Sequence, residues 1–190
     1  LGLKILYSAL NSREDVWCER AFCPWIDFEE VMRQNNIPLF AIESRDPIKD
    51  FDFLGFTLQY EMSYTNILNM LRLAKIPLHA KDRHGLKNIV FAGGVCAYNP
   101  EPLADFIDFF SLGEGEEITV EIVSLYDKAK AENWSKDEFL REAAKIPGVY
   151  VPSFYRHEYN EDGTLKLTWG VDAAKEAGVT GDELAEIFYQ

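Results

Sequence analysis

Two glycine-containing loops are the segments of this chain best suited to hold a ligand, because each follows a short apolar run. The run 89–95 contains Gly93-Gly94, and the run 109–112 leads into Gly113-Glu114-Gly115. Glycine lacks a Cβ, so the backbone of such a loop can approach a bound molecule and adopt positive φ. Loops of this kind bind ligands at the carboxyl ends of parallel strands. Because neither loop holds a nucleophile, a base or a metal-ligand set, the pattern predicts binding and not catalysis.

Neither loop has the spacing of a known phosphate-binding motif. Gly113-Glu114-Gly115 lacks the third glycine of a dinucleotide fingerprint, and no Lys-Ser or Lys-Thr pair follows it. Glu114, Glu116 and Glu117 would repel a phosphate, whereas the positive end of a helix stabilises such acidic residues without any ligand. Two interpretations therefore stay open for Gly93-Gly94, a ligand contact and an unligated turn. A dinucleotide-binding enzyme is the weakest of the functions considered.

Polar and aromatic residues also end the apolar run 51–59. Thr57 and Gln59 close this run, and Tyr60 and Glu61 follow it directly. The carboxyl ends of parallel strands meet at one edge of a sheet. We therefore expect these residues to form the wall opposite the glycine loops.

The other candidate residues for chemistry lack partners in the sequence. Cys18, Cys23 and Cys96 contain no CxxC pair and no neighbouring paired histidine. An odd number of cysteines in an acidic domain suggests reduced thiols rather than a disulfide framework or a metal site. The three histidines stand apart from one another and from any triad-like Asp or Ser: His79, His84 and His157. We predict no catalytic residue and no metal ligand in this chain.

The composition limits the classes of partner. Of 190 residues, 47% are hydrophobic and 14% aromatic, which suffices for one good core. A net charge of -13 repels nucleic-acid backbones and anionic lipid. No run is apolar for the length of a membrane span, and no signal peptide is evident. The sequence therefore predicts a cytoplasmic protein that binds neither nucleic acid nor membranes.

The chain alternates between extended and helical patterns, which is typical of an α/β fold. Asp27 and Ser63 are plausible helix N-caps. Pro38 ends the helix that starts at Asp27, and Pro77 ends the helix that starts after Ser63. We expect helices at 1–11, 27–36, 66–74 and 116–131, a helical turn at 102–106, and extended runs at 16–22, 39–42, 51–59, 88–92 and 109–112. The rhythm predicts a doubly wound, mostly parallel open sheet of about four to five strands with helices on both faces.

After residue 133 the pattern changes. Ser135 and Glu138 form a capping box for a short helix at 137–144. Extended runs at 149–159 and 165–169 flank Asp162-Gly163, which is a hairpin signal. The segment 172–190 has a helical pattern broken by glycines. We therefore divide the chain into a Rossmann-like domain at 1–133 and a helix, hairpin and helical tail at 134–190.

An ordered series of motifs resembles a known family. The series comprises Phe53–Glu61, Ala92–Gly94 followed by Asn99–Pro102, Gly113–Glu117, and Ile146–Pro152. It resembles the N-terminal cobalamin-binding-type region of radical SAM proteins. Within that superfamily it is most similar to the uncharacterised bacterial group described as Fe-S oxidoreductases. The resemblance runs from residue 1 to about residue 159.

The resemblance implies a cofactor and a catalytic partner. In such domains the corrin lies over the carboxyl ends of the strands, and Thr57, Leu58 and Gly93-Gly94 match the segments that line its nucleotide tail. A first strand and a histidine-bearing loop would precede the helix at 1–11, so we assign no cobalt ligand. Radical SAM chemistry needs three thiolates, usually spaced CxxxCxxC, for a 4Fe-4S cluster that binds S-adenosylmethionine. The three cysteines of this chain lack that spacing, so a downstream radical SAM barrel would hold both groups.

Two functions remain open. In the first, the chain is a cofactor-binding domain that is inactive alone, with residues 134–190 leading toward the catalytic domain. In the second, the same fold with an empty site is a protein-interaction or scaffold domain. We expect a valine at position 94 to abolish ligand retention and leave the fold intact. The candidate cofactor-binding residues are Thr57, Leu58, Gln59, Tyr60, Glu61, Gly93, Gly94, Gly113, Glu114 and Gly115.

Overall fold

The apolar runs found in the sequence pair as strands of one sheet. The computed structural model describes residues 2–170, and its first sheet holds β1 (Phe53–Thr57), β2 (Ile89–Gly93), β3 (Phe109–Ser111) and β4 (Val149–Tyr150). The strands lie side by side in chain order. β1, β2 and β3 are parallel, and β4 is antiparallel to β3. The predicted α/β fold with a mostly parallel sheet of four strands is confirmed.

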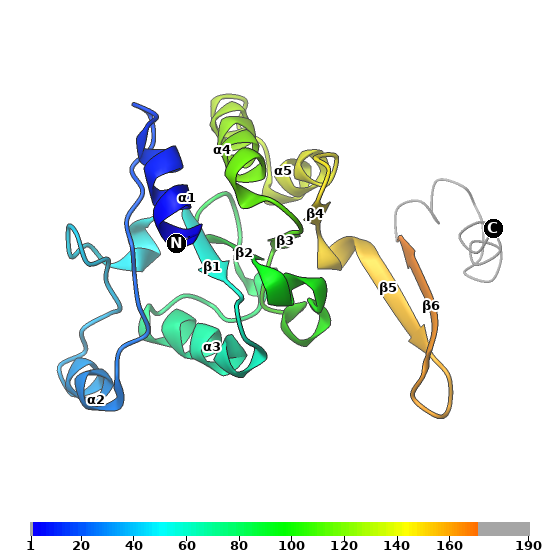
Figure 1. Ribbon diagram of the computed structural model, residues 1–190, viewed down its shortest axis with the longest axis horizontal. Coiled ribbons are helices and arrows are strands. Elements are labelled where there is room, and N and C mark those ends of the chain that lie inside the picture. The colour runs from blue at the N-terminus through cyan, green and yellow to red at the C-terminus, as the bar shows by residue number, and fades with distance from the viewer. Residues whose placement is uncertain (1, 171–190) are drawn as a thin grey trace. The chain divides into compact units, whose positions relative to one another are not determined.

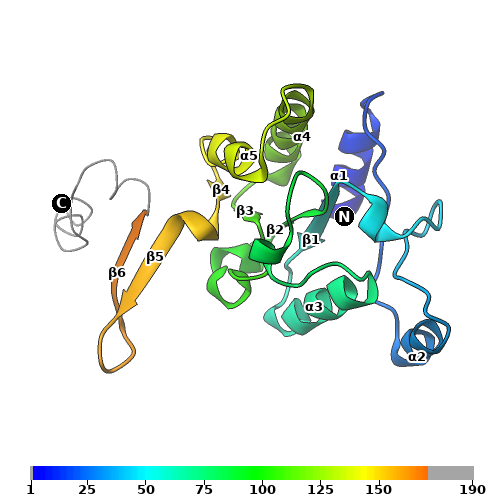
Figure 2. The same cartoon turned by 180° about the vertical axis from the view of Figure 1, so that it is seen from behind.

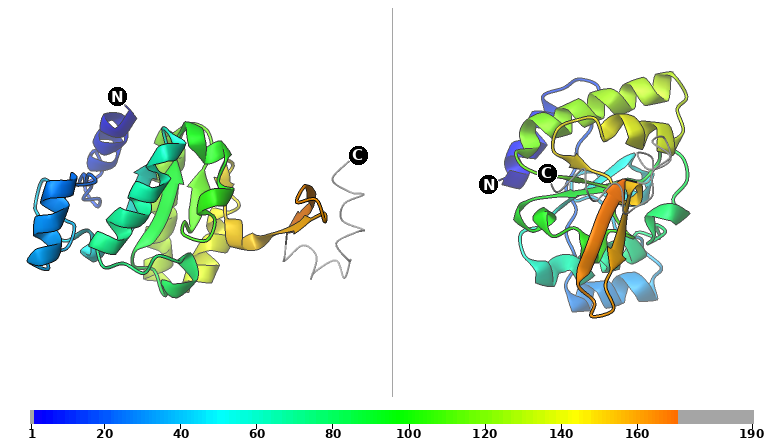
Figure 3. Two further views of the ribbon diagram at one scale, coloured as in Figure 1. Left: turned by 90° about the horizontal axis from the view of Figure 1, so that it is seen from below. Right: turned by 90° about the vertical axis from the view of Figure 1, so that its right-hand side faces the viewer.

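Helices cover both faces of this sheet, as expected. α3 (Tyr64–Leu73) lies on one face, and α4 (Gly115–Ala131) and α5 (Lys136–Ala143) lie on the other (Figure 1). The same layers are visible from behind (Figure 2) and from the side (Figure 3). α1 (Gly2–Asn11) packs against α4. α2 (Ile26–Gln34) is tied to α3, because the Asn69 amide donates a hydrogen bond to Glu29.

Each face of the sheet has its own apolar core, which explains why the strands have nearly continuous hydrophobic sequences. On the α3 face, Leu54, Val90 and Phe110 are buried with residues of the helix. The opposite face is aromatic, and the Phe91 and Phe109 rings stack with their centroids 5.1 Å apart. The remaining members of this aromatic cluster are Phe53, Tyr126 and Phe139.

A buried cluster of charges fixes the amino-terminal end of β3. Asp108 accepts hydrogen bonds from the backbone N–H of Val90 at 2.8 Å and from Arg83 Nη2 at 3.0 Å. Lys136 Nζ lies 2.5 Å from the other carboxylate oxygen. The Arg83 guanidinium also donates to three backbone carbonyls, those of Pro77, Leu78 and Phe106. The cluster therefore links α5 to the sheet at the edge opposite the glycine loops.

The first of two compact units, Leu1–Tyr150, includes α5 and β4; the second is Val151–Gln190. The predicted capping box at the start of α5 is confirmed. Glu138 N–H donates to Ser135 Oγ at 3.2 Å, and Ser135 N–H donates to the Glu138 carboxylate at 2.7 Å. Because α5 packs on α4 and β4 pairs with β3, both elements belong with the sheet.

The second unit contains the predicted hairpin. β5 (Tyr155–Tyr159) and β6 (Leu165–Gly170) are antiparallel, and Gly163 in their turn has a φ of +81°. The expected single extended run at 149–159 is wrong, since a short helix at Pro152–Phe154 separates β4 from β5. Proline has no N–H and fits the first turn of such a helix. The helix expected at 172–190 lies outside the described residues.

Two of the predicted extended runs form no strand of the sheet. Residues 16–22 are irregular, because side chains satisfy their backbone: Cys18 N–H donates to Asn11 and Arg20 N–H donates to Glu43. Residues 39–42 contribute only an isolated bridge between Phe40 and Pro47. The N-cap position of α2 is Trp25, whose side chain makes no capping hydrogen bond, and the predicted N-cap Asp27 lies in the first turn. Short 3-10 helices fill other connections: Ile48–Asp50, Glu61–Ser63, Ala80–Asp82, Val95–Tyr98 and Glu101–Leu103.

Candidate ligand cavity at the carboxyl ends of the strands

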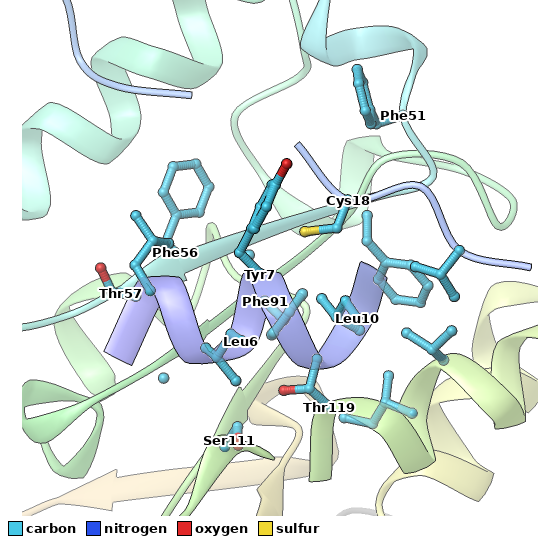
Figure 4. Close-up of a pocket in the computed structure, with 18 of the residues that line it drawn as sticks. Leu6, Tyr7, Leu10, Cys18, Phe51, Phe56, Thr57, Phe91, Ser111 and Thr119 are labelled. Atoms are coloured by element: carbon cyan, nitrogen blue, oxygen red, sulfur yellow. The ribbon is translucent and has the colours of Figure 1, made fainter. Parts of the chain in front are cut away.

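A cavity of about 1120 Å³ opens between one face of the sheet and the helices α1 and α4. The sheet contributes Thr57, Phe91 and Ser111, whereas α1 contributes Leu6 and Leu10 (Figure 4). The first turns of α4 and the loop before it add Gly113, Glu114, Gly115, Glu116 and Thr119 to the lining, which also includes residues of the segments 15–20 and 46–53. The cavity therefore combines apolar helix walls with the carboxyl ends of β1, β2 and β3.

Most of the predicted ligand-binding residues meet in this cavity. Seven of the ten candidate residues line it: Thr57, Gln59, Gly93, Gly94, Gly113, Glu114 and Gly115. Leu58 lies in the hydrophobic core with no exposed surface, because it faces α3. Tyr60 and Glu61 lie outside the cavity, and Tyr60 is 63% exposed. The three strand ends thus converge as expected, and the chain turns away from the cavity after Gln59.

Gly94 is required by the backbone itself. Its φ is +107°, and a Cβ there would lie 2.9 Å from the Leu58 carbonyl oxygen and 2.9 Å from Gln59 Nε2. The loop is held against the end of β1 by two hydrogen bonds. Leu58 N–H donates to the Gly93 carbonyl at 2.7 Å, and Cys96 N–H donates to the Leu58 carbonyl at 2.9 Å. The expectation that a valine at position 94 leaves the fold intact is therefore wrong.

Gly93 and Gly113 keep space free beside the ligand cavity. A Cβ on Gly93 would lie 3.3 Å from the Ser111 carbonyl oxygen, so a side chain would crowd the end of β3. Gly113 has a φ of +103°, and no atom lies within 4 Å of the position of its Cβ. A side chain at position 93 is therefore restricted by Ser111, whereas a side chain at position 113 is restricted only by the positive φ of the backbone.

Sequence reasoning missed Ser111 and the contribution of α1. Ser111 is 4% exposed, and its hydroxyl has no hydrogen-bond partner within residues 2–170. It shares its face of β3 with Phe109, so it points toward the cavity side of the sheet. The sequence signal that could have indicated Ser111 is that it is a single polar residue between the apolar residues Phe110 and Leu112. The role of α1 had no such signal, because its apolar stripe resembles that of any core helix.

The lining of the cavity is strongly acidic. Among residues 2–170, the cationic side chains that line it are Arg20 and Lys130, and both form ion pairs, with Glu43 and Asp52 respectively. The acidic lining residues are Asp15, Glu19, Asp46, Asp50, Asp52, Glu114, Glu116 and Asp127. Four of these carboxylates form ion pairs: Asp15 and Asp127 with Arg13, Asp50 with Lys87, and Asp52 with Lys130. The field of the other carboxylates, which include Glu114 and Glu116, opposes the binding of a free phosphate or carboxylate.

The thiols and imidazoles offer no reactive group to the cavity. Burial is the main cause that raises the pKa of Cys18, Cys23 and Cys96, and nearby carboxylates raise each pKa further. The thiols are therefore protonated at neutral pH. The His79 ring stacks on Phe106 with centroids 5.0 Å apart, away from the cavity. Within residues 2–170, no three potential ligands among His, Cys, Asp and Glu are grouped to hold a metal.

The outer edge of β1 carries unpaired backbone groups. The Asp52 carbonyl and the Leu58 N–H bond to β2, so by alternation the N–H and C=O groups of Phe53, Gly55 and Thr57 point away from β2. None of these groups has a partner in the part of the chain that the structure describes. All three residues line the cavity.

Comparisons with known proteins give one family and one relative. The family model described as the N-terminal region of radical SAM proteins matches residues 2–152. An uncharacterized protein of Methanocaldococcus jannaschii is 34% identical over 97 residues, which are 48% of this chain and 20% of that protein. The chain thus spans about a fifth of that relative's length. No solved structure matches the chain. Among the described helices, none has the length and apolar character needed to cross a bilayer.

Proposed function

The chain belongs to the family of N-terminal regions of radical SAM proteins, and from this premise we propose that it binds a cofactor for a catalytic domain outside residues 1–190. The observation that carries the proposal is the cavity at the carboxyl ends of β1, β2 and β3. Ligands of α/β sheets bind at these ends. In this proposal the 4Fe-4S cluster and S-adenosylmethionine belong to the catalytic domain, since the three thiols of this chain are protonated and separately placed.

Cobalamin is the cofactor that we propose for this cavity. The volume of about 1120 Å³ suits a large ligand, and Gly93 and Gly113 provide passages without side chains. The aliphatic residues Leu6 and Leu10 suit the apolar methyl groups of a corrin macrocycle. Such a group supplies cobalt-based methyl-transfer or redox chemistry. Residues of this chain would bind and orient it and exclude water from its buried side, without supplying a histidine ligand.

A matched pair of substitutions tests the cavity. Thr57→Trp should place a bulky ring in the cavity and obstruct it, whereas Thr65→Trp changes an exposed position of α3 on the other face of the sheet. We expect the parent chain and Thr65→Trp to change the visible spectrum of hydroxocobalamin and to retain colour after desalting. Thr57→Trp should bind at least about ten-fold more weakly, which corresponds to 1.4 kcal/mol. No spectral change and no retained colour with the parent chain would sink the cobalamin proposal.

The open edge of β1 favours a second candidate function, an interaction domain that receives an extended segment. A strand added to this edge would satisfy the backbone groups of Phe53, Gly55 and Thr57. In the isolated chain we expect the amides of these three residues to exchange quickly with deuterium. The amides of Leu54, Phe56 and Leu58, which face β2, should exchange slowly. If the interaction function is correct, all six amides become protected in the intact protein; continued rapid exchange of the outer three would exclude it.

A further inference from the structure

The Ser111 hydroxyl is a buried polar group that the protein leaves unsatisfied. The residue is 4% exposed, and no donor or acceptor within residues 2–170 reaches its Oγ. Buried hydroxyls nearly always have a hydrogen-bond partner, because losing water without replacement is costly. Ser111 lines the cavity at the end of β3 (Figure 4), and its Oγ is covered by the surrounding atoms in the unliganded protein. A ligand group in the cavity is therefore the natural partner of Ser111.

A second set of unused donors lies in the same cavity. α4 begins at Gly115, and its N-cap residue Glu114 makes no capping hydrogen bond with its side chain. The first backbone N–H groups of a helix have no partner within the helix. Gly113 and Gly115 both line the cavity, and neither places a side chain between these N–H groups and a ligand. The site therefore offers hydrogen-bond donors to a ligand oxygen.

The charge of the lining selects the kind of oxygen. Glu114 and Glu116 stand beside the donors, so a phosphate or carboxylate would be repelled. A carboxamide is uncharged, its carbonyl oxygen accepts hydrogen bonds, and its NH₂ group donates them. The carbonyl can accept from Ser111 and the first turn of α4, while the NH₂ group can donate to the glutamates. We infer that Ser111 and the start of α4 bind a carboxamide group of the ligand. This inference rests on the proposed function in using the same cavity.

Small probes test the site without the large cofactor. Acetamide at millimolar concentration should shift the amide NMR signals of Gly93, Ser111 and Gly115 in the ¹⁵N-labelled chain. Sodium acetate at the same concentration should leave them in place, and acetamide should not shift Gly93 and Gly115 in Ser111→Ala. Equal shifts with both probes, no shift with acetamide, or an unchanged response in Ser111→Ala would each overturn the inference.

Stability and cofactor binding give independent measures. Because the hydroxyl has no protein partner, Ser111→Ala should unfold at the same temperature as the parent or at a higher one. A midpoint several degrees lower would reveal a protein partner and contradict the inference. Hydroxocobalamin should bind Ser111→Ala about 3- to 10-fold more weakly, and Ser153→Ala, at an exposed position, should bind like the parent. Equal binding by Ser111→Ala would overturn the inference and keep the proposed function. If the parent chain responds to acetamide but does not bind cobalamin, the cobalamin proposal is overturned and the carboxamide inference is kept.

Discussion

Replacing Asp108 by alanine is expected to lower the free energy of unfolding of the chain by about 3–5 kcal/mol. The side chains of Asp108 and Arg83 are 1% and 2% exposed, and Lys136 also contacts the carboxylate. The variant would leave two cations without their common anion, one of them fully buried. The backbone N–H of Val90 would also lose its acceptor. Removing one member of a buried ion cluster is strongly destabilising, because the remaining charges stay buried without a partner. Replacing the whole cluster by apolar residues would change the free energy of unfolding far less.

Urea unfolding followed by circular dichroism measures this effect. Glu142→Ala is the matched control, because its ion pair with Lys145 is exposed and should contribute about 0–1 kcal/mol. Asp108→Asn keeps the volume of the side chain and should also be destabilised, since an amide cannot balance both cations. A loss below about 1 kcal/mol in both Asp108 variants would show that the cluster is hydrated and does not hold β3 in place.

The strands that could be predicted from the sequence are those that are covered on both faces of the sheet, because such strands are nearly continuous in apolar residues. β1 and β2 were found because Phe53–Thr57 and Ile89–Gly93 are nearly continuous in apolar residues. The capping box of Ser135 was predicted because both of its bonds are local. The convergence of Gly93 and Gly113 followed from the parallel order of the strands. Local patterns and topology were sufficient for these features.

Other features depend on contacts that the local sequence does not specify. Val16 to Phe22 has the residue types of a strand, yet it finds no neighbouring strand, and its backbone bonds instead to Asn11 and Glu43. Apolar spacing predicted α1 correctly but could not show that Leu6 and Leu10 border a cavity. Ser111 acquires significance only because it lines the cavity and no described residue bonds to its hydroxyl. These facts depend on distant segments.

Gly94→Ala should destabilise the first unit strongly. A φ of +107° combined with a ψ of -178° belongs to a region that is essentially limited to glycine, so alanine there costs about 1–3 kcal/mol. The added Cβ would also lie 2.9 Å from the Leu58 carbonyl oxygen, which β1 holds in place. Overpacking of this kind costs about a further 1–3 kcal/mol. We therefore expect loss of ligand binding through distortion of the loop as well as through blockage.

Gly113→Ala separates the two causes. Gly113 also has positive φ, but nothing lies within 4 Å of its Cβ position, so only the conformational cost of about 1–3 kcal/mol applies. Urea unfolding should rank the variants as parent, Gly113→Ala and then Gly94→Ala in decreasing stability. Equal stability of the two variants would mean that the loop after β2 moves away from Leu58 without cost. Such a result would support the interpretation that Gly94 is needed for contact with a ligand and not for the fold.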